Sequence, residues 1–153
     1  MPIFDTHEQK YVDSNPIPES LPPGRHICIC KGFSAEPVEI DRGGGKKAFW
    51  VVTFESCPDK GVGGQAAYWI QADIQTKAIA NTQWGEGRWS ILLNVYGITR
   101  DQTNFDTESL FLAPCVCEIG EAKGKTFIKT LHRCSPDQIK EADNYVIRMG
   151  YDD

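Results

Sequence analysis

Polar and apolar side chains alternate along residues 25–33 (RHICICKGF), and a period of two is typical of a β-strand. Ile27, Ile29 and Phe33 then share one face. Gly32 is the expected position of a bend or bulge, beyond which the strand can continue as far as Ile40. The tract that follows, DRGGGK, contains three consecutive glycines and therefore predicts a loop, because glycine loses the most conformational entropy in regular structure.

Residues 48–55 (AFWVVTFE) and 65–72 (QAAYWIQA) predict two further strands. Both segments are short and rich in aromatic and β-branched residues, and the breaker CPDKGVGG separates them. Both are apolar on two faces. This pattern indicates either deep burial or an outer face that binds a ligand.

Helical spacing replaces alternation in the next part of the chain. Apolar residues recur at helical intervals over residues 73–84 and again over residues 89–98, which predicts two short helices. Two more strands are expected at residues 114–121 and 126–133, and the connection between them, AKGK, contains the glycine that tight hairpin turns prefer.

The last predicted element is a C-terminal helix. Ser135 has the properties of an N-cap, Pro136 suits the first helical position, and Gln138 completes a capping box. The first 23 residues, in contrast, carry five prolines and are predicted to form an arm without a helix or a paired central strand.

The order of these elements predicts a mainly β fold with minor α content. Three strands, a helical connection and a two-stranded hairpin are the order of the OB-fold, a five-stranded, partly open Greek-key barrel. The expected organisation is an arm at residues 1–23, a barrel at residues 24–134 with the helical insertion between its third and fourth strands, and a helix at residues 135–153 packed on the same domain.

Composition restricts the kind of partner. The 153 residues carry 21 acidic and 16 basic side chains, a net charge of −5, so the protein is not a polycation that attracts nucleic acid from every side. The predicted loops are nevertheless locally basic. No segment has the apolar length of a membrane helix or a signal peptide, which predicts a cytoplasmic protein with no membrane partner.

The basic residues fall at the two loops that border the ligand face of an OB-fold, and aromatic residues lie between them. Alternation places Trp50, Val52 and Phe54 toward the core and leaves Phe49 outside, while Trp69 lies opposite Tyr68. Cations neutralise phosphates, and rings stack on unpaired bases. The predicted nucleic-acid-binding residues are Arg42, Lys46, Lys47, Phe49, Trp69, Lys123, Lys125, Phe127 and Lys129.

The chain also resembles a known family. The succession PPGRHICICKGF, GGGKKAFWVVTFE, KGVGGQAAYWI and LLNVYGI is similar to small phage proteins regarded as single-stranded-DNA-binding proteins of OB-fold type. The resemblance covers about residues 21–133 and implies coating of single strands during phage DNA replication or recombination, in the host cell cytoplasm, beside other replication or recombination proteins. It carries no catalytic residue. The acidic tail with a terminal hydrophobe that many such proteins use to recruit partners is replaced here by GYDD.

Each of these features also has a structural explanation. The lysines can be solubilising turn residues, and Phe49 and Trp69 can both be core. The pairs Cys28/Cys30 and Cys115/Cys117 would place four thiols on neighbouring strands, as in a zinc site, but they lack the usual C-x2-C knuckle, so core packing is the expectation and no metal or cofactor is assigned. No phosphate-binding loop, G-x-S-x-G elbow or H-E-x-x-H motif is present, so an enzyme is not expected.

Two functional hypotheses follow. The first is a protein that binds single-stranded DNA without sequence preference, with RNA as an open alternative and with self-association through free strand edges. The second is a phage-encoded protein-interaction module that inhibits a host factor through its acidic charge and an aromatic surface. Quenching of tryptophan fluorescence by oligo-dT would distinguish them.

Overall fold

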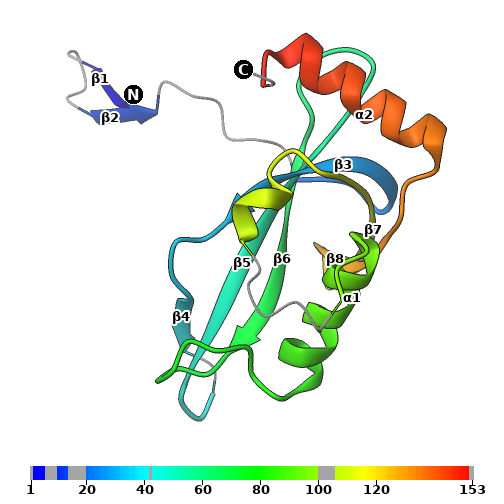
Figure 1. The fold of residues 1–153 in the computed structure, drawn as a ribbon. Helices are drawn as coiled ribbons and strands as arrows, with labels where there is room; N and C mark the ends of the chain where they lie inside the picture. The colour runs from blue at the N-terminus through cyan, green and yellow to red at the C-terminus, as the bar shows by residue number, and fades with distance from the viewer. Residues whose placement is uncertain (1, 6–9, 14–19, 42, 100–105, 152–153) are drawn as a thin grey trace.

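The computed structural model describes residues 2–5, 10–13, 20–41, 43–99 and 106–151, and a six-stranded antiparallel sheet forms its centre (Figure 1). The order of the strands is β6-β5-β3-β7-β8, and β4 pairs with the first half of β5 on the edge that β3 occupies further along. The strand bounds are β3 Gly24–Phe33, β4 Val38–Asp41, β5 Lys46–Ser56, β6 Gln65–Ala72, β7 Pro114–Ala122 and β8 Lys125–His132.

All five predicted strands are confirmed, with ends that differ from the structure by at most two residues. The sixth strand arises at the predicted irregularity. Gly32 has a φ of +123°, and the register between β3 and β5 shifts between Cys30 and Gly32. The chain then leaves the sheet after Phe33 and re-enters it as β4, so the first predicted strand is two strands.

The sheet curls so that its two end strands meet. β6 and β8 contact each other, but no hydrogen-bonded ladder joins them in the described part of the chain. The curled sheet therefore remains open along the seam between β6 and β8.

The predicted helix over residues 73–84 is wrong for all but its end. Asp73 Oδ1 accepts hydrogen bonds from the backbone N–H groups of Gln75 (2.9 Å) and Thr76 (2.8 Å), and this local turn competes with a helix. Ile79 instead pairs with Ala72. The helical part begins later, as the π-helical turn η1 (Gln83–Gly87) and the α-helix α1 (Arg88–Val95), which confirms most of the second predicted helix.

Two clusters of buried residues hold the fold together. The larger one lies inside the curled sheet and includes Phe54, Tyr68 and Ile70 from the strands and Leu92 from α1. The smaller one lies on the outer side of β3, where the C-terminal helix α2 (Pro136–Met149) packs Tyr145 and its neighbours against Ile29. The two strand faces of β3 are therefore both covered, one by each cluster.

The capping box of α2 is confirmed. The Gln138 N–H donates to Ser135 Oγ (3.3 Å), and the Ser135 N–H donates to Gln138 Oε1 (2.8 Å). A buried polar contact fixes the other end of the helix, because the Tyr145 hydroxyl donates to Glu55 Oε2 at 2.6 Å. Figure 1 shows α2 at one end of the molecule and α1 beside the opposite half of the sheet.

The N-terminal segment is more regular than its prolines predict. β1 (Pro2–Asp5) and β2 (Lys10–Asp13) pair as a separate antiparallel two-stranded sheet, which does not join the main one. Further along the chain, Ser20 bridges to Gln65, and Leu21 is buried in the larger cluster. None of the described helices is long and apolar enough to cross a membrane.

One further helical turn, η2 (Thr107–Leu110), precedes β7. Asp106 caps it by accepting the backbone N–H of Glu108 at 3.0 Å. Its Leu110 is buried in the larger cluster, and this anchors the turn to the sheet.

Candidate nucleic-acid interface

A groove of about 380 Å³ lies along the seam between β6 and β8, and two of the predicted rings line it. Trp69, in the middle of β6, is 36% exposed, and Phe127, near the start of β8, is 48% exposed. Most of the other lining residues, among them Thr53 and Ala67, are small or weakly polar. The groove therefore presents two accessible aromatic side chains on a floor without bulky obstruction.

Gly120 creates the space in which the Phe127 ring lies. The two residues are register partners on β7 and β8. A Cβ atom at Gly120 would lie 3.1 Å from Cζ of Phe127, closer than ordinary van der Waals contact. The absence of a side chain at Gly120 thus lets the Phe127 ring lie on the outer surface of β7.

Phe49 was predicted to be an exposed ring, and the structure places it beside Trp69 but buries it. Alternation is as predicted, since Val52 and Phe54 belong to the inner cluster and Phe49 lies on the other face of β5. However, Phe49 is only 8% exposed, and Trp69 packs on it edge to face with ring centroids 5.7 Å apart. Phe49 supports Trp69 and does not itself offer a ring face.

The predicted basic turn between β7 and β8 borders the groove. Lys123 and Gly124 both have positive φ values, +53° and +76°, as a two-residue hairpin turn requires. Lys123 and Lys125 are exposed there. Lys125 is separated from Phe127 by a single residue, Thr126, which itself lines the groove. Two cations therefore lie at the end of the groove that Phe127 occupies.

The second basic loop lies further away along β5. Lys46 and Lys47 are exposed and pair with Asp41 and Ile40 of β4. Val51 on β5 is the register partner of Trp69. Lys47 lies four residues before Val51, which is about 14 Å along the strand. The structure does not bring these lysines into the lining of the groove. Arg42 lies outside the described residues.

Lys129, the remaining predicted cation, already has an anionic partner. It occupies a bulge of β8, and its Nζ lies 3.8 Å from Oε2 of Glu118. Glu118 also accepts hydrogen bonds from Arg25 Nε (3.3 Å) and pairs with His132 Nε2 (2.9 Å). The hydrogen bond with His132 and the neighbouring charges of Arg25 and Lys129 lower the pKa of the Glu118 carboxyl. Arg25, Lys129 and His132 thus form a cluster around one carboxylate.

Arg88, which sequence reasoning missed, spans the open seam beneath the groove. Its Nε donates to the carbonyl of Trp69 on β6 at 2.9 Å, and its Nη2 donates to the carbonyl of Ile128 on β8 at 3.2 Å. The guanidinium also stacks 4.1 Å from the centroid of the Tyr68 ring. Burial lowers the pKa of Arg88. Arg88 therefore replaces the missing ladder between the two strands with two side-chain hydrogen bonds.

Trp84 was also missed as a surface ring. It lies in η1, is 61% exposed, and has its ring centroid 5.4 Å from the Arg88 guanidinium carbon. Its position among glycines and polar residues (QWGEG) is the only sequence signal for exposure, because such a segment offers it little to pack against. Trp69 and Trp84 therefore both adjoin Arg88.

The four paired cysteines belong to the core. Cys28, Cys30, Cys115 and Cys117 are fully buried in the larger cluster, and Cys28 is the register partner of Cys115. Within the described residues, no group of three or more histidine, cysteine or acidic side chains is arranged to hold a metal ion. All six thiols are free.

Function has to be inferred from this arrangement of side chains. No protein-family model matches the chain, and no curated protein matches it in sequence.

Proposed function

We propose that the protein binds single-stranded DNA without sequence preference, as an OB-fold-type barrel. The observation that carries this proposal is the groove along β6 and β8, in which Trp69 and Phe127 are exposed together beside the basic β7–β8 turn. The strand order supports the fold assignment. Taking β3 and β4 as one interrupted strand, the sequence is three strands, a helical connection and a two-stranded hairpin, the order of an OB-fold.

The chemistry of the groove suits unpaired bases. Each accessible ring can stack on one base, and such stacking contributes about 1 to 3 kcal/mol per base whatever the base is. The support that Phe49 provides under Trp69 holds that ring in place before a strand arrives, which reduces the conformational entropy lost on binding. A duplex has its bases stacked internally and gains nothing from these rings.

The cations supply the second part of the affinity. Lys123 and Lys125 lie at one end of the groove, and Lys46 and Lys47 lie about 14 to 17 Å from Trp69 along β5. By alternation Lys47 shares the outer face of β5 with Val51, the partner of Trp69. A single strand that runs between the two basic loops would cross the rings. Because the whole chain carries a charge of −5, this attraction is local to that path.

Binding of a labelled oligo-dT, followed by fluorescence anisotropy over a series of salt concentrations, tests the proposal. The logarithm of affinity should fall linearly with the logarithm of salt, with a slope of about −0.7 for each phosphate neutralised. Lys46→Ala combined with Lys47→Ala should flatten that slope by about 1.4. Trp69→Ala should weaken binding by about 5- to 150-fold and leave the slope unchanged, because stacking releases no counterions.

Matched variants separate these effects from general loss of charge or fold. Lys60→Ala with Lys140→Ala removes two exposed lysines from the β5–β6 loop and from α2, and should leave the slope as it is. Trp69→Phe keeps a ring and should retain most of the affinity. No anisotropy change with oligo-dT at low salt would refute the proposal and favour a protein-interaction module.

In this proposal the protein coats single strands during phage DNA replication or recombination, as the family resemblance implies. RNA is tested in the same experiment with oligo-U. Equal affinity for oligo-U and oligo-dT would assign the groove to single-stranded nucleic acid in general, since neither stacking nor phosphate neutralisation distinguishes the two sugars.

A further inference from the structure

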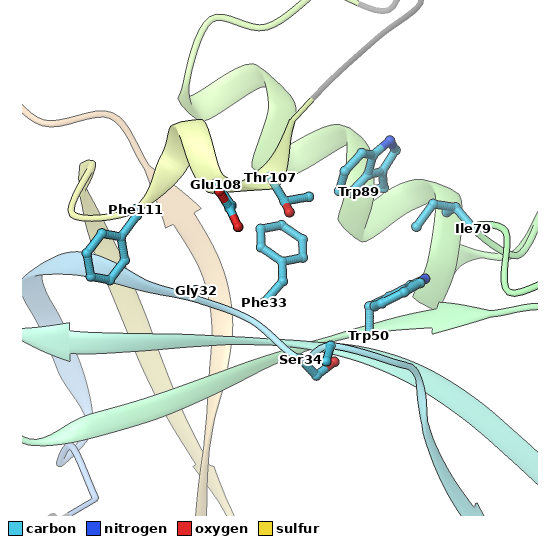
Figure 2. A pocket seen from close by; sticks show the side chains of 10 residues that line it. Gly32, Phe33, Ser34, Trp50, Ile79, Trp89, Thr107, Glu108 and Phe111 are labelled. Carbon is cyan, nitrogen blue, oxygen red and sulfur yellow. The ribbon is translucent and has the colours of Figure 1, made fainter.

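A second cleft, of about 750 Å³, lies outside the groove described above, between the sheet and η2 (Figure 2). Its floor is formed where the chain leaves β3 at Gly32 and turns toward β4, and by Trp50 of β5. Its other sides come from Trp89 of α1 and from Thr107, Glu108 and Phe111. The interruption of the first strand is therefore what opens this cleft.

Four aromatic rings line the cleft, and several are held in fixed positions. Phe33 and Trp89 pack edge to face with centroids 6.3 Å apart, and Trp50 Nε1 donates to the carbonyl of Lys77 at 3.0 Å. Phe111 is 51% exposed at the rim. The faces of aromatic rings carry negative electrostatic potential, so a cavity walled by rings attracts cations.

The charge of the cleft has the same sign as the ring faces. Among the described residues that line it, Glu108 is the one with a charged side chain. Figure 2 shows the Thr107 and Glu108 side chains extending from η2 toward the Phe33 ring. Within the described residues the Glu108 carboxylate makes no ion pair or side-chain hydrogen bond. Two nearby lysines have other contacts: Lys77 pairs with Glu36 at 3.5 Å, and Lys31 Nζ lies 3.5 Å from the centroid of the Tyr151 ring.

One aromatic ring of the cleft already contacts a cation within the protein. Lys31 Nζ also lies 5.7 Å from the centroid of the Phe111 ring, so one wall of the cleft already takes part in a cation–π contact. A nucleotide suits the cleft less well, because its phosphate would meet Glu108 and none of the lining residues is a cation.

We propose that this cleft binds the arginine side chain of a basic segment of a partner protein. The guanidinium would stack on the rings, as arginine does more readily than lysine, and pair with the Glu108 carboxylate. Charge complementarity selects this occupant, since the cleft combines aromatic walls with a carboxylate that has no ion pair among the described residues. The Lys31 ammonium at the rim lies closer to the Tyr151 ring (3.5 Å) than to the Phe111 ring (5.7 Å). The site is separate from the proposed DNA groove, so the protein would bind a basic partner without releasing its strand.

The test uses two pentapeptides, acetyl-Gly-Ala-Arg-Ala-Gly-amide and the same peptide with neutral, isosteric citrulline in place of arginine. Binding to the full chain is followed by NMR at the indole N–H groups of Trp50 and Trp89 at low ionic strength. The arginine peptide should bind at least about tenfold more tightly than the citrulline peptide. Glu108→Gln should reduce that ratio to about one to two, whereas Glu121→Gln, which removes an exposed carboxylate on β7, should leave it unchanged.

A second variant tests the rings independently of the carboxylate. Phe111→Leu keeps an apolar side chain at an exposed position and should weaken arginine binding about threefold with little effect on citrulline. Equal binding of the two peptides, or an unchanged ratio in Glu108→Gln, would overturn the inference. Displacement of the arginine peptide from the cleft by oligo-dT would instead assign the cleft to the nucleic-acid surface, whereas failure of oligo-dT binding alone would overturn only the proposed function.

Discussion

Glu118 controls the positive charge on the outer surface of β7 and β8. Three groups, Arg25, Lys129 and His132, share its two carboxylate oxygens at distances of 2.9 to 3.8 Å. A phosphate that approaches Lys129 must compete with this carboxylate. Glu118 therefore limits how much of the local positive charge is available to an approaching phosphate.

Glu118→Gln should raise the affinity for oligo-dT by about two- to fivefold at low salt, the range expected for releasing exposed ion pairs. The amide keeps the size of the side chain and removes its charge. Anisotropy titrations at low salt measure the change. Glu121→Gln removes a carboxylate from the same strand, one that pairs with no cation in the described residues, and should give a smaller increase. An equal increase in both variants would attribute the effect to net charge alone.

The same substitution has a defined dependence on pH. Interactions that stabilise the charged carboxylate lower the pKa of Glu118 in the folded protein. Their contribution to stability is therefore complete at neutral pH and is lost as the pH falls through that lowered pKa. The unfolding free energies of Glu118→Gln and the wild type should consequently converge in acid, as urea denaturation at several pH values would measure.

On β5 and β6, sequence alternation predicts the direction of a side chain better than its exposure. On β3 it fails beyond the bulge at Gly32, because Phe33 was predicted to share a face with Ile29 and instead packs against the larger cluster. On the other two strands it correctly separates Phe49 and Trp69 from the inward-facing Val52 and Tyr68. It does not reveal that Trp69 covers Phe49, because that contact joins two strands whose register the sequence does not specify. Exposure depends on neighbours that are distant in the chain, and direction depends only on the local backbone.

At the scale of elements, the turn and the helix cap that depend on a few neighbouring residues were predicted correctly. The Lys123–Gly124 turn and the capping box at Ser135 and Gln138 depend on neighbouring residues and are present as predicted. The helix over residues 73–84 failed because Asp73 satisfies two backbone N–H groups itself and Ile79 pairs with β6. Helical spacing of apolar residues does not reveal whether a turn or a strand pairing competes with the helix.

Arg88 was not predictable from local signals, because its two acceptors belong to strands that precede and follow it in the chain. Arg88→Met should lower the free energy of unfolding by about 1.5 to 3 kcal/mol, the range for hydrogen bonds from a charged donor, because methionine fills part of the volume and donates nothing to the Trp69 and Ile128 carbonyls. Urea denaturation measures the change.

Arg133→Met is the matched control for the seam. Arg133 is exposed and directs both of its hydrogen bonds to one carbonyl, that of Asn94, so it joins no pair of strands. Arg133→Met should lower the free energy of unfolding by less than Arg88→Met does. If Arg88→Met were as stable as the wild type, the contact between β6 and β8 would be maintained by apolar packing alone.

At the scale of the whole molecule, the two-sided apolar strands are explained by two layers of packing and one open face that carries the groove. The inner cluster covers one face of the sheet, α2 covers the outer side of β3, and the outer face of β6 carries the groove. The sequence predicted that such strands are buried or bind a ligand, and the structure shows that burial accounts for most of their surface. Which part stays open depends on where α2 packs, and no local pattern specifies that.

The reactivity of the cysteine thiols measures whether the fold is intact. Burial raises the pKa of Cys30 to about 11 and that of Cys57 to about 12, and five of the six thiols are buried. At pH 8 about one thiol in a thousand or fewer would be ionised at such a site, and a thiol reagent in solution cannot reach the five buried sulfur atoms. Burial also raises the pKa of Cys134 to about 11, so exposure and not ionisation distinguishes this thiol from the other five. A thiol reagent should therefore modify the partly exposed Cys134 first in the native protein, more slowly than a free thiol, and all six thiols in denaturant.

Modification of the buried thiols then measures how often the fold opens, and it links stability to the proposed function. A ligand that binds only the folded state at 100 times its Kd should slow opening-limited modification about 100-fold. Saturating oligo-dT should have this effect on the buried thiols and leave the rate at Cys134 almost unchanged, while Cys134→Ser removes the fast phase and identifies it.

Rapid reaction of four or more thiols in the native protein would contradict the packing of the inner cluster. Slow reaction that oligo-dT does not slow further would mean that the strand does not bind preferentially to the folded protein, because any such preference must reduce the population of the open state by the same factor.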